Sequence, residues 1–167
     1  MIIRNIKEED IPEYIRWVNQ VWNETYRGIV DDSFLDNMEN TTEYRIKRQK
    51  EKYKNNELNT VYVMLDDDRL IGYTSINHSR DEEKNDSGDI SSLYLLKEYQ
   101  GKGLGTKLYN YSLNKLILKG YRDYIISCLD KNETNEFYKK KGGKLYNYKY
   151  RKIGDKEYKE NFYYFEV

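Results

Sequence analysis

The apolar residues near the start of the chain change period, from the alternation of a strand to the spacing of a helix. Residues 2–6 alternate apolar and polar side chains, which predicts a short strand. Residues 12–23 are predicted as a helix with one buried face, because apolar side chains recur there at spacings of three and four. These side chains are Ile15, Val18 and Trp22, and they continue the spacing that begins at Ile11, just before Pro12. The following stretch, 40–54, is mostly charged and predicts a helix with a solvated face.

The middle of the chain carries strand patterns. Residues 60–65 and 70–77 are apolar runs on either side of an acidic turn, which predicts an antiparallel hairpin. Residues 89–96 become almost continuously apolar toward their end, which is typical of a central strand buried on both faces. Three strands therefore follow the first helices.

The second half alternates helices and strands before ending in two strands. The predicted elements are a helix at 104–119, a strand at 124–129, a short helix at 133–141, and strands at 144–152 and 158–167. No linker or repeat interrupts the chain, so we expect one domain spanning residues 1–167. The order predicts an α/β fold with a mixed, mostly antiparallel central sheet and helices on both faces.

Composition narrows the function classes. The 29 basic and 29 acidic residues cancel, so the global field does not favour a nucleic-acid partner. The single cysteine, Cys128, cannot form an internal disulfide, and no apolar run approaches the ~20 residues of a membrane span. We expect a cytoplasmic protein without a membrane partner. His78 has no second histidine or cysteine nearby, so no metal site is expected.

The turn between the strand at 89–96 and the helix at 104–119 is the most informative segment. It reads Gln100-Gly101-Lys102-Gly103-Leu104-Gly105-Thr106. Alternate glycines let the backbone approach a ligand and present free N–H groups at the positive end of a helix dipole. The spacing excludes both a dinucleotide-binding fingerprint and a Walker A loop. The segment therefore predicts a pyrophosphate-binding turn.

Within this turn, Gln100-x-x-Gly103-x-Gly105 resembles the acyl-CoA pyrophosphate loop of the GCN5-related N-acetyltransferase (GNAT) family. The later segment from Asn132 to Tyr138 is similar to the second cofactor segment of that family. Residues 22–30 and the C-terminal tail are also similar to many such enzymes, so the resemblance covers essentially the whole chain.

The resemblance implies acetyl-CoA as co-substrate, without a metal. In the family, the asparagines of the second segment hold the pantetheine arm, and the tyrosine faces the thioester sulfur. Tyr138 is thereby implied as the acid that protonates the leaving thiolate, and a backbone N–H near Leu95 as the donor to the oxyanion. The implied cofactor-binding residues are Leu93, Tyr94, Leu95, Gln100, Gly101, Lys102, Gly103, Leu104, Gly105, Thr106, Asn132, Asn135 and Tyr138.

The proton acceptor stays open between three alternatives. An amine acceptor is mostly protonated at neutral pH, so some group must take its proton. Asp89 lies at the start of the central strand, where many related enzymes carry an acidic residue; Glu24 lies near the expected acceptor wall; water is the third alternative. Trp22 and Tyr26 are expected to line the acceptor pocket.

The function predicted from these residues is transfer of an acetyl group from acetyl-CoA directly to a primary amine of a small molecule, peptide or protein. The alternative is a non-catalytic acyl-CoA-binding module that keeps the glycine turn without acceptor chemistry. Cys128 is expected to be a buried apolar side chain, not a nucleophile. The identity of the amine, the range of acyl groups, and the choice between monomer and homodimer stay open.

Overall fold

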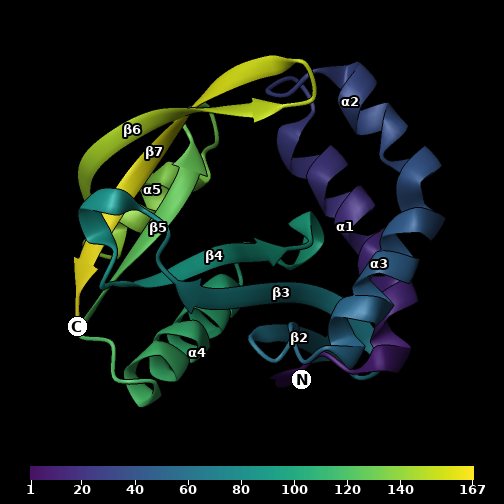
Figure 1. Cartoon of the computed structure of the whole chain (residues 1–167), viewed down its shortest axis with the longest axis horizontal. Helices are drawn as coiled ribbons and strands as arrows, with labels where there is room; N and C mark the ends of the chain where they lie inside the picture. The colour runs from purple at the N-terminus through teal and green to yellow at the C-terminus, as the bar shows by residue number, and fades with distance from the viewer.

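The computed structural model describes residues 1–167 and contains one seven-stranded sheet in the order β1-β2-β3-β4-β5-β7-β6 (Figure 1). The strands are β1 (Ile2–Asn5), β2 (Val61–Asp66), β3 (Arg69–His78), β4 (Gly88–Leu95), β5 (Asp123–Leu129), β6 (Lys144–Ile153) and β7 (Lys156–Glu166). The α-helices are α1 (Ile11–Tyr26), α2 (Asp32–Asn37), α3 (Thr42–Lys54), α4 (Leu104–Leu118) and α5 (Thr134–Lys140). Only β4 and β5 pair in parallel. The predicted α/β class with a mostly antiparallel sheet is confirmed.

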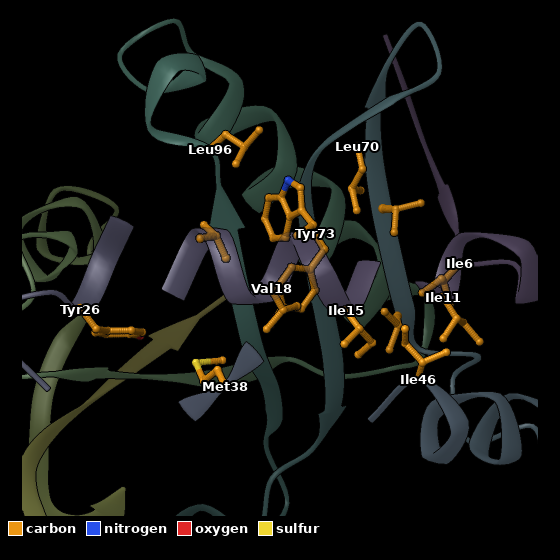
Figure 2. Packing of buried hydrophobic residues seen from close by; sticks show 14 of the residues in the cluster. Ile6, Ile11, Ile15, Val18, Tyr26, Met38, Ile46, Leu70, Tyr73 and Leu96 are labelled. Carbon is orange, nitrogen blue, oxygen red and sulfur yellow. The ribbon is translucent and has the colours of Figure 1, made fainter. Parts of the chain in front are cut away.

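Alternation along the strands divides the core between the two faces of the sheet. On β2, Val63 packs with α1 to α3, whereas Tyr62 on the opposite face packs with α4 and its neighbours. Figure 2 shows Ile15 and Val18 of α1 beside Tyr73 of β3. The helices thus cover both faces, α1 to α3 on one and α4 and α5 on the other (Figure 1).

Helix α1 is longer than the spacing of its apolar residues predicts. It continues past residue 23 to Tyr26, whose side chain is buried, and ends before Gly28, where φ is 82°. The extra turn places Tyr26 against β4. No helix combines the length and the apolar composition that crossing a membrane requires.

Strands β4 and β5 separate after two paired positions. Gly88 pairs with Tyr124 and Asp89 with Ile125, and beyond them the two strands diverge (Figure 1). On its other side β4 stays paired with β3, with Ser91 as an extra, bulged residue. The second half of β4 is therefore only partly buried, which corrects the prediction of a strand buried on both faces.

The hairpin of β6 and β7 reaches across the sheet to the start of α2. Lys156 forms an ion pair with Asp31, and the Asp31 N–H donates to the Tyr158 hydroxyl over 2.9 Å. The hairpin thus connects the far edge of the sheet to the helices that begin the chain. The space between β4 and β5 lies beneath this connection (Figure 1).

Candidate active site

The divergence of β4 and β5 produces a cavity of about 450 Å³, which we call the central cavity. Its walls come from the second half of β4, from Ser127 and Cys128 of β5, from the end of α1, and from Tyr138 of α5. A strand pair that separates leaves backbone groups and side chains facing the gap, so the cavity is a consequence of sheet topology. Its volume suits a small ligand.

A second hollow, the loop cavity, lies between the glycine turn and α5. Its volume is about 440 Å³, and Gly101, Gly103, Gly105 and Thr106 line it. The two cavities share six lining residues: Leu93, Tyr94, Leu95, Gln100, Glu133 and Thr134. They therefore adjoin, and together they form a groove from the start of α4 to the gap between β4 and β5.

The glycine turn offers a row of free donors to this groove. The backbone N–H groups from Gly101 through Thr106 make no hydrogen bond within the protein. Gly103 is the N-cap of α4 with φ of 77°, and Gln100 supports the turn by donating to the Leu95 carbonyl over 3.0 Å. A Cβ atom added at Gly105 would meet no protein atom within 4 Å. The turn thus has free donors at a helix N-terminus and an open approach, which is the geometry that favours an anion.

Tyr138 projects into the central cavity from α5. Its side chain is only 4% exposed, and its hydroxyl has no hydrogen-bond partner in the protein. Burial raises the pKa of Tyr138 well above its usual value of 10.0, so the hydroxyl is protonated at neutral pH. Asn132 also lines the cavity, and its Oδ1 accepts the Thr134 N–H over 2.9 Å. This leaves the Asn132 amide N–H groups available to a ligand.

The side chains of three predicted cofactor residues do not line the groove. Asn135 is buried, its Nδ2 donates to the Leu129 and Asn132 carbonyls, and its Oδ1 accepts the Tyr163 hydroxyl over 2.7 Å. Its hydrogen-bonding capacity is used in holding the β5–α5 connection. Lys102 is exposed beside the Tyr99 ring, and Leu104 packs against a core cluster. The other predicted cofactor residues line one or both cavities.

The two candidate proton acceptors differ in how they meet the central cavity. Asp89 lies behind the wall, where its carboxylate accepts the Ser91 hydroxyl over 2.8 Å, and Ser91 lines the cavity. Burial raises the pKa of Asp89 to about 6. Glu24 lines the cavity directly and accepts the Lys97 N–H over 3.2 Å. Asp89 thus connects to the cavity through a hydroxyl, and Glu24 without an intermediary.

Sequence reasoning missed a second serine–carboxylate pair in this wall. Glu160 of β7 is 8% exposed and accepts the Ser127 hydroxyl over 3.0 Å, and Ser127 lines the central cavity. The pairing of β5 with β7 brings them together. Glu160 is opposite Leu129, and Ser127 lies two residues from Leu129, on the same face of β5. The available signal was Ser127 itself, a polar residue within an apolar strand.

The predicted acceptor residues Trp22 and Tyr26 lie on different sides of one aromatic wall. Tyr26 lines the central cavity, and its hydroxyl lies 2.7 Å from the Tyr94 hydroxyl. Burial raises the pKa of Tyr26 to about 12. Trp22 packs edge-on against Tyr26, with ring centroids 4.8 Å apart, and faces a separate cavity. Only Tyr26 of the pair is therefore in direct reach of the central cavity.

Cys128 lines the central cavity, a position that its apolar surroundings in the sequence do not reveal. Burial raises the pKa of its thiol to about 12, so the thiolate is scarce at neutral pH. His78 lies at the end of β3, where its Nδ1 is 3.0 Å from the Tyr121 hydroxyl. No group of three or more His, Cys, Asp or Glu side chains is placed to hold a metal ion.

A turn with free N–H donors at a helix start, joined to a gap between parallel strands, has the geometry that a phosphate-bearing ligand requires. The model of the acetyltransferase (GNAT) family matches residues 18–143. An uncharacterized N-acetyltransferase of Bacillus subtilis, YuaI, is 26% identical over 81% of this chain and 76% of that protein. N-alpha-acetyltransferase 30 of Schizosaccharomyces pombe is 31% identical over 54% of this chain and 61% of that protein.

Solved structures share the fold. The PaiA N-acetyltransferase of Thermoplasma acidophilum, in complex with coenzyme A, superposes with a TM-score of 0.70 at 21% identity, over 95% of this chain and 96% of that chain. YncA of Salmonella typhimurium, solved with acetyl-CoA, gives a TM-score of 0.64 at 18% identity, over 99% and 92% of the two chains. The chain belongs to the acetyltransferase (GNAT) family and is an N-acetyltransferase.

Proposed function

We propose that the protein transfers an acetyl group from acetyl-CoA directly to a primary amine of a small molecule, peptide or protein. The run of free N–H groups from Gly101 through Thr106 carries this proposal, because it opens into a groove that ends at Tyr138. A pyrophosphate needs such donors, and a thioester needs a polar, partly enclosed cavity beyond them. The neighbours solved with coenzyme A and acetyl-CoA support the same assignment.

The groove residues divide the binding task by chemistry. The glycine turn would hold the pyrophosphate, and the Asn132 amide, free to donate, would bind the pantetheine arm. Near Leu95, β4 is paired with β3 but has no strand partner on the side of the gap, and a backbone N–H on that side would donate to the oxyanion that forms on attack. Acetyl-CoA supplies the activated acyl group, and the protein supplies orientation and proton transfer.

We assign proton transfer to residues from different elements of the cavity wall, β4 and α5. During transfer a bond forms from the amine nitrogen to the carbonyl carbon, and the bond from that carbon to sulfur breaks. The amine loses a proton, and we assign its acceptance to Asp89, reached through Ser91. The departing thiolate gains a proton, which Tyr138 donates. Each turnover therefore moves one proton from the amine to Asp89 and one proton from Tyr138 to the thiolate, so no net proton is gained or lost.

A test of this function is release of CoA thiol when amines are added. Purified protein and acetyl-CoA are incubated with a panel of amines, polyamines, amino acids, aminoglycosides and peptides with free N-termini, and thiol and acetylated product are both measured. We expect amine-dependent release with at least one class. Acetyl-CoA binding without release for every class would favour the non-catalytic acyl-CoA-binding alternative.

Replacing Asp89 with asparagine is expected to lower kcat/KM about 5- to 10-fold near pH 7. Because burial raises the pKa of Asp89 to about 6, the basic carboxylate form predominates above that pH and is lost below it. The wild-type profile should therefore fall on the acid side with a midpoint near 6, and the variant should lack this limb. The difference in kcat/KM between wild type and variant should become smaller as the pH approaches the pKa of the amine, ~10.4 for a lysine-like acceptor, because the amine is then increasingly deprotonated without a base.

The matched variant is Glu24→Gln, which changes the other cavity carboxylate. It should retain the acidic limb of the pH profile. If the acidic limb disappears in Glu24→Gln and persists in Asp89→Asn, then Glu24 is the proton acceptor. If both variants keep the wild-type pH profile of kcat/KM, water accepts the amine proton.

A further inference from the structure

A third cavity of about 380 Å³ lies among α1, α2, α3 and β3; we call it the helix cavity. None of its lining residues lines the central cavity. Four aromatic side chains form much of its wall: Tyr14, Trp22, Phe34 and Tyr73. Figure 2 shows the Tyr73 ring pointing from β3 toward α1. The groups that complete the wall include two polar side chains of α3, Arg45 and Gln49.

Arg45 is a partly buried cation without a carboxylate partner. It forms no ion pair, and its one protein partner is the Asn19 Oδ1 atom. Asn19 also donates through its Nδ2 to Glu39 over 3.0 Å, so Glu39 is linked to Arg45 only through Asn19. Burial lowers the pKa of the Arg45 guanidinium. A desolvated charge is costly unless paired, and Arg4, also partly buried, illustrates the usual solution with its 2.6 Å contact to Asp10.

Gln49 lies one helical turn beyond Arg45, on the same face of α3. Its Oε1 atom is buried and has no hydrogen-bond donor in the protein. An unpaired buried acceptor is costly, because the hydrogen bonds that it would make to water are not replaced. The cavity therefore presents an unpaired cation and an unpaired acceptor side by side, against an aromatic wall. A ligand that fits would combine an apolar body, an anionic group and an adjacent N–H or O–H donor.

We infer that the helix cavity binds a small molecule with an apolar body and a carboxylate, with Arg45 as the counter-ion of the carboxylate. A guanidinium matches the planar carboxylate through paired donors. The aromatic rings supply the surface against which the apolar body packs. This site goes beyond the proposed acetyl transfer, because its ligand chemistry does not depend on the reaction.

Two sources supply a ligand of this chemistry, the far end of the amine acceptor or a separate small molecule. A wall two aromatic rings thick separates the helix cavity from the central cavity. Tyr73 lines the first and stacks on Tyr94, which lines the second, with ring centroids 5.4 Å apart and planes inclined by 13°. Trp22 and Tyr26 meet in the same wall. A ligand in the helix cavity would therefore contact rings that pack directly against rings of the central cavity.

The test compares carboxylates with their uncharged amides. Phenyllactate and indole-3-lactate, which carry an O–H donor beside the carboxylate, are titrated into the full chain by calorimetry at low salt, with phenyllactamide and indole-3-lactamide as controls. We expect each acid to bind about 5- to 10-fold more tightly than its amide. Arg45→Gln should remove that difference. The matched control, Arg48→Gln, changes an exposed, unpaired arginine on the same helix and should preserve it.

Equal affinity of acid and amide for the wild type, absence of saturable binding by all four probes, or equal losses in Arg45→Gln and Arg48→Gln would overturn the site. If Arg45→Gln does not fold, the wild-type comparison and Arg45→Lys, which keeps the charge, decide the question. Competition with the acceptor in the thiol-release assay would identify the acceptor's far end, and binding without competition a separate ligand. A protein inactive in that assay would still show the acid–amide difference, so failure of the two proposals is distinguishable.

Discussion

Replacing Tyr138 with phenylalanine is expected to reduce kcat roughly 10- to 100-fold while folding and acetyl-CoA affinity change little. The hydroxyl has no hydrogen-bond partner in the protein, so its removal breaks no internal bond. The ring that packs against Phe137, with centroids 5.6 Å apart, is retained. What is lost is a protonated donor in the central cavity, because burial holds the Tyr138 pKa well above 10.0. The expected loss lies at the lower end of general-acid effects, since a CoA thiolate leaves readily.

The control for this change is Tyr124→Phe. Tyr124 is also buried, but its hydroxyl is bonded to the Tyr109 hydroxyl and it lines neither cavity of the groove. This variant should lose about 1 kcal/mol of stability in urea unfolding and keep its turnover. Single-turnover rates with the true acceptor separate chemistry from product release. A wild-type rate for Tyr138→Phe in that experiment would make the tyrosine structural and assign the proton to water.

Replacing Gly105 with valine is expected to weaken acetyl-CoA binding at least about 10-fold, or ~1.4 kcal/mol. Gly105 lines the loop cavity within the first turn of α4, and a Cβ there meets no protein atom within 4 Å. The added bulk therefore occupies ligand space without disturbing the fold. Gly103→Val is a less clean test, because φ of 77° at Gly103 would add backbone strain.

Calorimetry on folded protein measures this effect, with Asn110→Val as the matched control. Asn110 is an exposed residue of the same helix and lines neither cavity of the groove. Its replacement introduces the same side chain and should leave the dissociation constant unchanged. An unaltered dissociation constant in Gly105→Val would remove the glycine turn as the pyrophosphate site.

Much of the fold was readable from the sequence because its signals are local. Strand alternation, helical spacing and glycine stops depend on neighbours within a few residues, and they predicted the order of elements correctly. The turn from Gln100 to Thr106 was equally legible, since free donors at a helix start follow from the chain itself. The prediction that Tyr138 faces the reacting thioester came from resemblance and stays a prediction.

Other features depend on which strands pair, and no local pattern carries that information. The separation of β4 from β5 follows from two paired positions and a bulge at Ser91, and it exposes the end of a strand that reads as buried. Asn135 matches a cofactor pattern, yet the β5–α5 connection uses its whole amide.

The sequence by itself determined the order of elements and the position of the glycine turn. Tertiary structure alone decided that β5 pairs with β7, which brings Glu160 to Ser127, and that Trp22 and Tyr26 face different cavities. It also placed Arg45 against an aromatic wall with no carboxylate in contact. The difference lies in the distance along the sequence between the interacting residues. A turn or a helix cap is determined by adjacent residues, whereas a cavity is formed by distant segments that meet only when the sheet and its helices pack.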